Sequence, residues 1–411
     1  MVEPTPVERA PVERDPDEKP PLTIALVAGE ISGDNLGAPL IREIKRKYPH
    51  ARFVGIGGPA MIAEGLESWF DIDRLSVNGF VDPIKRLPEL IKILLTLRSR
   101  LLATPPDCFV GVDFNFFNLL LEGMLKRRGI KTAHYVSPTV WAWRSGRVKG
   151  IKKNVDLMLT LYPFENAIYE QYEVGVRFVG HPRAHEIDPE AGLRNQPESR
   201  RLFGYGQEDL IVAILPGSRG GEVGYSGPDF FSAARLVKKN RRDAKFIVPA
   251  ANARRRIQIE KMLQESFPDI DVQVVDGQSR EVMTAADVVL VNSGTATLEA
   301  LLLKKPMVMS YRLGAITYGI VSRIVKTQYF ALPNILAGRE LIPELMQDAA
   351  TPEALSEAVL NLFNPGIREN LVREFDTIHR KLRLDSGSEA CDAILELCGK
   401  PGESGGASVS P

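Results

Sequence analysis

Short apolar runs that alternate with longer amphipathic stretches constrain the fold of this sequence more than any other feature. The first series of runs, rich in valine and isoleucine, comprises LTIALVAG, ARFVGIGG, CFVGVDF, KTAHYVS, DLMLTLY and VRFVG. A second series follows with LIVAILPGS, AKFIVPA, VQVVDG, VVLVNSG and PMVMSY. Alternating strands and helices predict parallel sheets covered by helices on both faces. We therefore expect an α/β protein with two doubly wound, Rossmann-like domains.

The proline-containing segment GHPRAHEIDPEAGLRNQPES separates the two series and predicts a linker. It divides the chain into an N-terminal domain over residues 22–184, a linker over 185–200 and a C-terminal domain over 201–398. A length of 411 residues suits two domains of common size. The start (1–21) is rich in proline and charge and predicts a disordered tail, and the Gly/Ser-rich end (399–411) predicts a flexible one.

Composition argues against several functional classes. The 52 basic and 52 acidic residues cancel, so net charge gives no sign of a nucleic-acid partner. Cys108, Cys391 and Cys398 have the spacing of neither a disulfide framework nor a metal site, which predicts a reducing cytoplasm. No apolar stretch approaches the roughly 20 residues that span a bilayer. The acidic pairs at 71–73 and 269–271 follow no strand, and we expect neither a metal nor a cofactor.

The turn AGEISGD after the first apolar run has the glycines of a phosphate loop at the wrong spacing. The middle glycine of G-x-G-x-x-G is missing, and no Gly-Lys-Ser/Thr follows. Glu30 and Asp34 would also place negative charge beside a phosphate. Because proline is best tolerated in a first turn, Pro39 predicts a helix that begins near Asn35 or Leu36. Ser32 and Asp34 would then help to cap that helix.

The second half of the chain offers a better phosphate site. VVLVNSGTATLEALLLKKP runs from a strand at 288–291 through an Asn-Ser-Gly turn into a helix that begins near Thr295, whose exposed N–H groups suit a diphosphate. Glu299 lies one turn deeper on the same face, where a carboxylate could accept bonds from ribose hydroxyls. Arg219 in ILPGSRGGEV suits a phosphoryl leaving group, or else pairs with Glu222 on the surface.

Two further polar residues follow predicted strands of the first domain. Asp113 in CFVGVDFNFFN ends a buried strand, and the ends of parallel strands face the ligand crevice. Its carboxylate is therefore a candidate general base, although it could instead bind loop N–H groups as a structural residue. His181 follows the strand VRFVG, and it is either a ligand-binding or an ordinary loop residue.

Taken together, these motifs resemble those of the lipid A disaccharide synthase family. The resemblance covers about residues 22–397 and rests on AGEISGDNLG, FVGIGGPAM, FVGVD, YVSPTVWAWR, FVGHP, LPGSRGGEV, NSGTATLEALL and KTQYFALPNILAGRELIPELMQ. It implies the GT-B architecture, in which two Rossmann-like domains face across a cleft. It also implies metal-free, inverting transfer of 2,3-diacylglucosamine from UDP to 2,3-diacylglucosamine 1-phosphate, which yields a β(1→6) disaccharide and UDP.

The resemblance further implies roles for individual residues. Asp113 matches the base that takes the proton of the acceptor's 6-hydroxyl. The expected donor-site residues are Arg219, Ser293, Gly294, Thr295, Glu299 and Asn334. On the acceptor side we expect Glu30, Ser32, Asp34, Trp141, Trp143 and His181, although the two tryptophans could equally fill the core.

Two departures from the family pattern stand out. The family commonly reads D-A-P-D-F after the FVG strand, and here DFNFF places Phe116 where a second Asp usually stands. The family also commonly has an Asp shortly after GHP, where this chain reads GHPRAHE. The chain keeps the first Asp, so the base assignment holds. A UDP-sugar epimerase-like enzyme and a non-catalytic nucleotide-sugar binder stay open as alternatives, whereas the missing G-x-G-x-x-G disfavours a nicotinamide oxidoreductase.

The stretch PIKRLPELIKILLTLRSRLL, residues 83–102, predicts an amphipathic helix. Such a helix either lies in a membrane interface or packs its apolar face on the sheet. The implied acylated substrates favour a cytoplasmic protein associated peripherally with the inner membrane. The C-terminal helices either cross back to the first domain or exchange with a neighbouring chain, which would give a homodimer.

Overall fold

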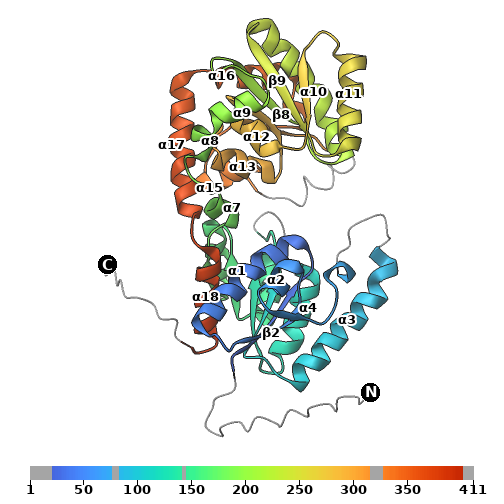
Figure 1. Cartoon of the computed structure of the whole chain (residues 1–411), viewed down its shortest axis with the longest axis vertical. Coiled ribbons are helices and arrows are strands. Elements are labelled where there is room, and N and C mark those ends of the chain that lie inside the picture. Colours follow the sequence, from blue (N-terminus) through green and yellow to red (C-terminus); the bar gives the residue numbers. More distant parts are fainter. Residues whose placement is uncertain (1–20, 76–82, 141–144, 315–326, 401–411) are drawn as a thin grey trace, which may run out of the picture.

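The computed structural model describes residues 21–75, 83–140, 145–314 and 327–400. The predicted acceptor residues Trp141 and Trp143 lie outside these ranges, as do most of the two predicted tails. The prediction of two parallel α/β domains is confirmed, and Figure 1 shows them stacked along the long axis of the molecule.

A seven-stranded parallel sheet forms the centre of the first domain, in the order β3-β2-β1-β4-β5-β6-β7. Its strands are β1 (Thr23–Ala28), β2 (Arg52–Ile56), β3 (Leu66–Ser68), β4 (Cys108–Val112), β5 (Lys131–Tyr135), β6 (Leu157–Thr160) and β7 (Gly175–Phe178). The helices of this domain are α1 (Ile31–Lys47), α2 (Pro59–Ala63), α3 (Pro83–Ala103), α4 (Asn115–Lys126), α5 (Val148–Asn154) and α6 (Asn166–Gln171). All five residues of β4 are buried, as expected for a strand with helices on both faces.

The second domain has a six-stranded parallel sheet in the order β10-β9-β8-β11-β12-β13. The strands are β8 (Leu210–Leu215), β9 (Ala244–Ala250), β10 (Val272–Asp276), β11 (Val288–Asn292), β12 (Met307–Tyr311) and β13 (Glu344–Met346). Its helices are α9 (Gln196–Leu202), α10 (Gly220–Asn240), α11 (Ala253–Ser266), α12 (Ser279–Ala285), α13 (Thr295–Leu302), α15 (Leu332–Ala337), α16 (Pro352–Asn361) and α17 (Pro365–Leu382). Short 3₁₀ turns lie at Ile72–Arg74, Ser145–Arg147, Pro163–Glu165 and Gln347–Ala349.

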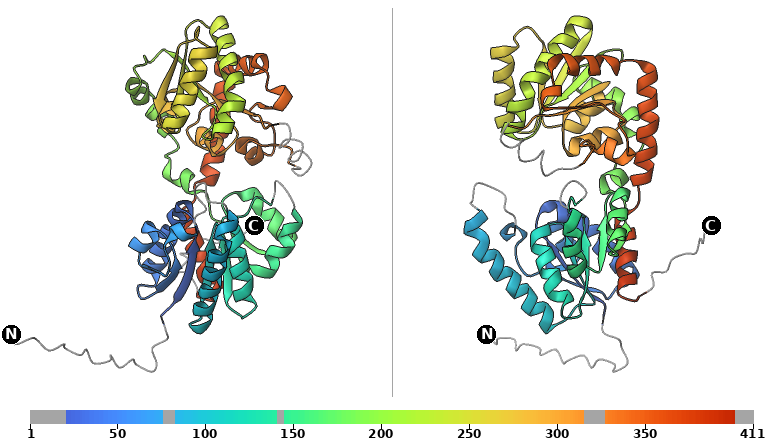
Figure 2. Two further views of the ribbon diagram at one scale, coloured as in Figure 1. Left: turned by 90° about the vertical axis from the view of Figure 1, so that its right-hand side faces the viewer. Right: turned by 180° about the vertical axis from the view of Figure 1, so that it is seen from behind.

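The chain passes between the domains twice. The first passage carries α7 (Pro182–Glu186) and α8 (Ala191–Arg194), and Ala184 packs within the core of the second domain. Buried His379 of α17 holds this passage, since its Nε2 lies 3.0 Å from the Ala184 carbonyl oxygen. In the second passage the chain leaves α17 and enters α18 (Ser386–Leu397), which lies beside α1 in both figures (Figures 1 and 2).

Helix α18 belongs to the core of the first domain. Its residues Cys391 and Ile394 share an apolar cluster with Ile24 and Leu26 of β1. Gly387 permits the close approach to α1, because a Cβ there would lie 2.9 Å from the Cβ of Pro39. The last helix of the described residues therefore completes the first domain.

The prediction that α1 begins near Asn35 or Leu36 is wrong. The helix begins at Ile31 and continues through Pro39, which lies inside it. Pro39 packs against α18, so tertiary contacts there outweigh the local preference of proline for a first turn. The earlier start also changes which way the next residues face, as Asp34 shows below.

Candidate functional site

Four strand-to-helix turns meet the expectation for a binding crevice. In each sheet the strand order reverses at one point, between β1 and β4 in the first domain and between β8 and β11 in the second. Ligands of open α/β sheets bind at such points, outside the carboxyl ends of the strands. Most of the predicted site residues follow one of these four strands. Strand order thus places them at the two expected crevices.

The turn after β4 holds Asp113 in an uncommon backbone conformation. Asp113 and Phe114 both have positive φ values, 52° and 46°, a region that residues other than glycine rarely occupy. The buried side-chain amide of Asn118 fastens the turn by donating to the carbonyl oxygens of Val27, at 3.0 Å, and Asp113, at 2.8 Å. The half-buried Asp113 side chain accepts a 3.3 Å bond from the amide of Asn115. A carboxylate is thus presented at the sheet edge by a strained and well-anchored turn.

The turn after β1 leaves Glu30 and Ser32 exposed at the start of α1. It contacts the Asp113 turn, since a Cβ on Gly29 would lie 2.3 Å from the Phe114 ring. The two turns therefore form one continuous edge of the first domain.

The prediction that Asp34 caps its own helix is wrong, and its predicted contact with the acceptor stays a prediction. Its buried carboxylate accepts backbone N–H bonds from Gly58 at 2.8 Å, Ala60 at 2.9 Å and Met61 at 3.0 Å. Asp34 therefore caps α2, the neighbouring helix. Because α1 begins earlier than predicted, residue 34 faces inward.

The second domain holds a cavity of about 580 Å³ at the carboxyl ends of β8 and β11. Its lining includes the predicted donor-site residues Arg219, Ser293, Gly294 and Thr295, together with Asn292. Gly294 has φ 150°, which lets the chain turn into α13 with its first N–H groups open to the cavity. The side-chain nitrogen of Asn292 is buried without a hydrogen-bond partner among the described residues. A buried donor of this kind needs a partner, and the adjoining cavity can supply one.

Arg219 lines this cavity and also forms the predicted pair with Glu222. Its side chain is 86% exposed at the cavity wall, and its guanidinium lies 3.4 Å from the Glu222 carboxylate. The other oxygen of Glu222 accepts the backbone N–H groups of Ser218 and Arg219, at 2.9 and 3.1 Å. The loop after β8 is therefore held by Glu222, and the exposed Arg219 side chain projects from it with Glu222 as its ion-pair partner.

Glu299 lies on α13 one turn beyond the cavity and links the two domains. Its carboxylate accepts a 2.8 Å bond from Arg280 and a 3.2 Å bond from Arg183 of α7. Only 11% of the Glu299 side chain is exposed. Two arginines thus pair with this carboxylate at the junction, and its predicted contact with a ribose stays a prediction.

Asn334 does not line this cavity, and its predicted contact with the donor stays a prediction. Its buried amide oxygen accepts the N–H groups of Leu341 and Ile342, at 2.7 and 2.8 Å. Its amide nitrogen donates to the Ile342 carbonyl at 2.9 Å and the Glu344 carboxylate at 2.7 Å. All four bonds of the amide are used, so Asn334 shapes the loop before β13.

His181 forms part of the passage between the domains. Its Nδ1 accepts the N–H of Arg183 at 3.2 Å and so caps α7, and its ring lies 5.4 Å from that of Tyr162. Burial and the nearby Arg183 charge lower the pKa of His181 to about 4, so the ring is neutral at physiological pH. The structure thus gives His181 a loop-capping role.

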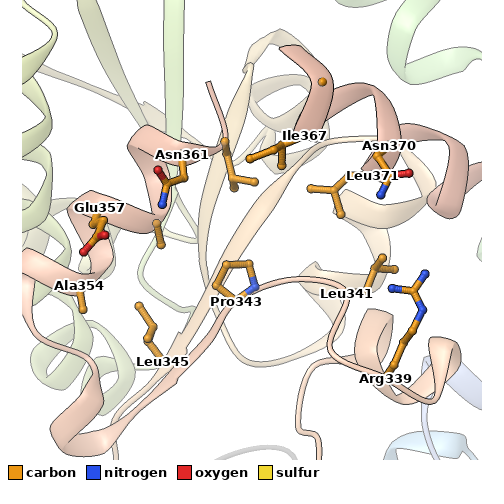
Figure 3. Close-up of a pocket in the computed structure, with 13 residues that line it drawn as sticks. Arg339, Leu341, Pro343, Leu345, Ala354, Glu357, Asn361, Ile367, Asn370 and Leu371 are labelled. Atoms are coloured by element: carbon orange, nitrogen blue, oxygen red, sulfur yellow. The ribbon is translucent and has the colours of Figure 1, made fainter. Parts of the chain in front are cut away.

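A second cavity, of about 640 Å³, lies in the second domain away from the strand ends. Figure 3 shows Leu341, Pro343 and Leu345 facing it from the chain around β13, with Ile367 and Leu371 contributed by α17. Its lining contains none of the predicted site residues, and its arginine, Arg339, is paired with Glu374 at 2.7 Å. The lining also includes Glu357, Asn361 and Asn370, but it lies away from the strand ends where most of the predicted site residues gather.

Metal clusters and membrane-spanning helices are both absent from the described ranges. No group of three or more His, Cys, Asp or Glu side chains there is placed to hold a metal ion. Among the helices of the same ranges, none is both long and apolar enough to cross a membrane.

Comparison with solved structures shows the fold. A UDP-GlcNAc 2-epimerase from Neisseria meningitidis, bound to UDP-GlcNAc, matches with a TM-score of 0.54 at 11% identity, over 91% of this chain and 98% of that one. A glycosyltransferase from Rickettsia africae matches with a TM-score of 0.58 at 10% identity, over 92% and 98%. The chain therefore has the two-domain fold that glycosyltransferases and UDP-sugar epimerases share.

Sequence comparison separates these classes. Proteins named lipid-A-disaccharide synthase match over 92% of this chain and 98% of their own length, with 50% identity in Pseudomonas savastanoi pv. phaseolicola and 49% in Azotobacter vinelandii. The epimerase-like alternative is accordingly not favoured. The family model described as lipid-A-disaccharide synthetase matches residues 24–393. The chain belongs to this family, which comprises glycosyltransferases of lipid A biosynthesis.

Proposed function

We propose that the enzyme moves 2,3-diacylglucosamine from UDP to the 6-hydroxyl of 2,3-diacylglucosamine 1-phosphate in one inverting displacement. The observation that carries the proposal is the contrast between the two crevices. The first domain presents the carboxylate of Asp113, and the second presents a cavity lined by the open N–H groups at the start of α13. A base and an anion-binding site are the two groups that such a displacement needs.

On the donor side, the diphosphate of UDP would bind at the start of α13. Backbone N–H groups and the helix dipole stabilise a negative charge there. The unpaired amide nitrogen of Asn292 supplies one further donor, although sequence reasoning did not single it out. The exposed side chain of Arg219 would leave Glu222 and reach the departing phosphate. Glu299 would exchange one of its arginine partners for the ribose hydroxyls.

On the acceptor side, Asp113 would take the proton of the 6-hydroxyl as the new bond forms. Attack from the face opposite to UDP inverts the anomeric carbon. The exposed side chains of Glu30 and Ser32 lie on the edge that contacts the Asp113 turn, where they would bind the acceptor sugar. Hydrogen bonds from the α13 start and the charge of Arg219 would stabilise the leaving group without a metal.

We also propose that α3 binds the cytoplasmic surface of the inner membrane. One face of α3 packs on the sheet through Ile93 and Leu97, while Leu87, Ile91 and Leu95 form a second, exposed stripe four residues apart. Lys92 is exposed beside that stripe. An apolar stripe flanked by cations is typical of helices that lie in a lipid interface.

The reaction is tested with purified protein, UDP-2,3-diacylglucosamine and the acylated acceptor in the presence of a metal chelator. We expect UDP and a disaccharide lipid to form only when both substrates are present, with a β linkage in the product. Isomers of the UDP-sugar without acceptor would instead support an epimerase. Donor binding without turnover would support a non-catalytic binder.

Membrane binding is tested by co-sedimentation with vesicles that contain anionic phospholipid. The double variant Ile91→Glu, Leu95→Glu is expected to lose most of the binding, because it places two carboxylates in the stripe. Ile257→Glu is the matched control, since Ile257 is an exposed isoleucine on α11 of the other domain. Equal binding by the double variant and the control would exclude α3 as the contact.

A further inference from the structure

A buried glutamate–histidine pair lies directly behind the Asp113 turn. Glu122 of α4 and His134 of β5 are both fully buried, and Glu122 Oε1 lies 2.7 Å from His134 Nδ1. Gly111 makes room for the pair, because a Cβ there would lie 2.3 Å from Glu122 Oε1. Burying two ionisable groups is costly in free energy. The proposed displacement uses neither of these two groups.

The pair is connected to Asp113 through one residue. His134 Nε2 lies 3.1 Å from the amide oxygen of Asn115, and the amide nitrogen of Asn115 donates to Asp113 Oδ1 at 3.3 Å. Glu122, His134, Asn115 and Asp113 thus form a continuous hydrogen-bonded chain from the interior to the sheet edge.

Donor and acceptor rules fix the direction of this chain. An amide oxygen can only accept, so His134 Nε2 carries a hydrogen. Burial raises the pKa of the Glu122 carboxyl more than the neighbouring His134 lowers it, and Glu122 Oε2 has no partner among the described residues. Both observations favour a neutral carboxyl group that donates to Nδ1. Each bond then points from Glu122 toward the carboxylate of Asp113.

We propose that Glu122, His134 and Asn115 position Asp113 for proton abstraction. The inference rests on the proposed role of Asp113 as the base. His134 fixes the Asn115 amide so that its nitrogen, rather than its oxygen, faces Asp113. That bond holds one carboxylate oxygen and leaves the other for the acceptor's hydroxyl. No proton moves along this hydrogen-bonded series, which orients the base.

Asn115→Leu removes the final donor and keeps a side chain of similar size. We expect kcat to fall about tenfold, since a hydrogen bond to a charged group is lost. The KM values and UDP affinity should stay unchanged. The acid limb of the pH profile of kcat should move to higher pH, because a carboxylate that loses a donor binds a proton more readily.

A second pair of variants tests the interior of the chain. Glu122→Leu should lower kcat and move the acid limb as Asn115→Leu does. Glu122→Gln should restore most of the loss, since the glutamine amide can donate to Nδ1 as the neutral carboxyl does. If kcat of Glu122→Gln were no higher than kcat of Glu122→Leu, the assigned direction of the hydrogen bonds would be contradicted.

Thr132→Val is the matched structural control. Thr132 is buried on the same strand as His134. Its hydroxyl donates to the Asn154 carbonyl at 2.9 Å, away from the hydrogen bonds that link Glu122 to Asp113. It should lower thermal stability and leave the pH profile in place. An Asn115→Leu enzyme with normal kcat and an unmoved acid limb would overturn the inference. If Asp113→Asn were then still inactive, the base assignment would stand, whereas a fully active Asp113→Asn enzyme would refute that assignment first.

Discussion

The turns after β4 and β11 occupy equivalent places in the two domains and differ in chemistry. Each follows the strand at which the order of its sheet reverses. The first presents a carboxylate on a turn with two positive φ values at residues other than glycine. The second presents backbone N–H groups beyond Gly294. The same fold thus carries the proposed base in one domain and the proposed anion site in the other, and the residues of the two turns make the difference.

The two turns also differ in whether their polar side chains already have hydrogen-bond partners. Side-chain amides of Asn115 and Asn118 bind the carboxylate and the carbonyl of Asp113. After β11, Thr297 closes the turn on the Gly294 carbonyl at 2.8 Å, and the Asn292 amide nitrogen is left buried and unpaired in the described part of the chain. The first turn is preorganised, whereas the second keeps an unpaired donor that the proposed ligand would bind.

Asp113→Asn should have the largest effect on turnover. The amide cannot accept the proton of the acceptor, so we expect kcat to fall about 10³-fold, within the range for loss of a general base. UDP affinity, measured by calorimetry, should stay unchanged because the donor cavity lies in the other domain. A variant that turns over at the full rate would show that another group is the base.

Glu165→Gln tests a second carboxyl group at the same edge of the first domain. Glu165 is buried after β6, and burial raises its pKa to about 7, whereas an unfolded glutamate has an ordinary pKa near 4.5. Between these values the folded state keeps a proton that the unfolded state has lost. The free energy of unfolding therefore falls as pH rises through this window, by roughly 3 kcal/mol.

The variant should remove this pH dependence. Urea unfolding at pH 5 and pH 8 should show Glu165→Gln more stable than the natural chain at pH 8 and close to it at pH 5. Glu173→Gln is the control, since Glu173 is an exposed glutamate. An equal difference at both pH values would mean that Glu165 is charged throughout.

The fold and the positions of the two turns could be predicted because both leave local patterns. Buried parallel strands read as apolar runs, and the residues just after them lie at the ligand edge. Asp113 and the residues after β11 were placed in this way. The three-residue strands β3 and β13 are too short to leave such a pattern.

The rest of the site depends on contacts between distant segments. The carboxylate of Asp34 accepts hydrogen bonds from N–H groups more than 20 residues away, and no pattern around residue 34 indicates these bonds. In the sequence Glu122 is an ordinary polar residue of α4, and only the fold shows that β5 places His134 beside it. Asn292 stands in a turn that was correctly placed, but its missing partner is visible only in three dimensions.

Gly294→Ala should weaken the anion site selectively. A Cβ at φ 150° is strained although nothing lies within 4 Å of it, so the turn shifts and misdirects the N–H groups beyond it. We expect UDP affinity to fall about tenfold, or roughly 1.4 kcal/mol. Gly338→Ala is the matched control, because Gly338 also has positive φ, 68°, and open space around it, and it lies outside the cavity lining. If both variants bound UDP equally well, the α13 start would not hold the nucleotide.

Glu30→Gln should have the smallest effect and sharpens the assignment of the first domain's edge. The exposed carboxylate loses its charge but keeps an acceptor oxygen, so KM for the acceptor should rise a few-fold while UDP affinity is unchanged. Asp34→Asn is the contrasting variant. It replaces one oxygen that accepts N–H groups of α2 with a donor, which should cost about 1–3 kcal/mol of stability without changing KM in the folded fraction. Loss of UDP affinity in Glu30→Gln would instead assign the turn after β1 to the nucleotide, and the division of labour between the two crevices would fail.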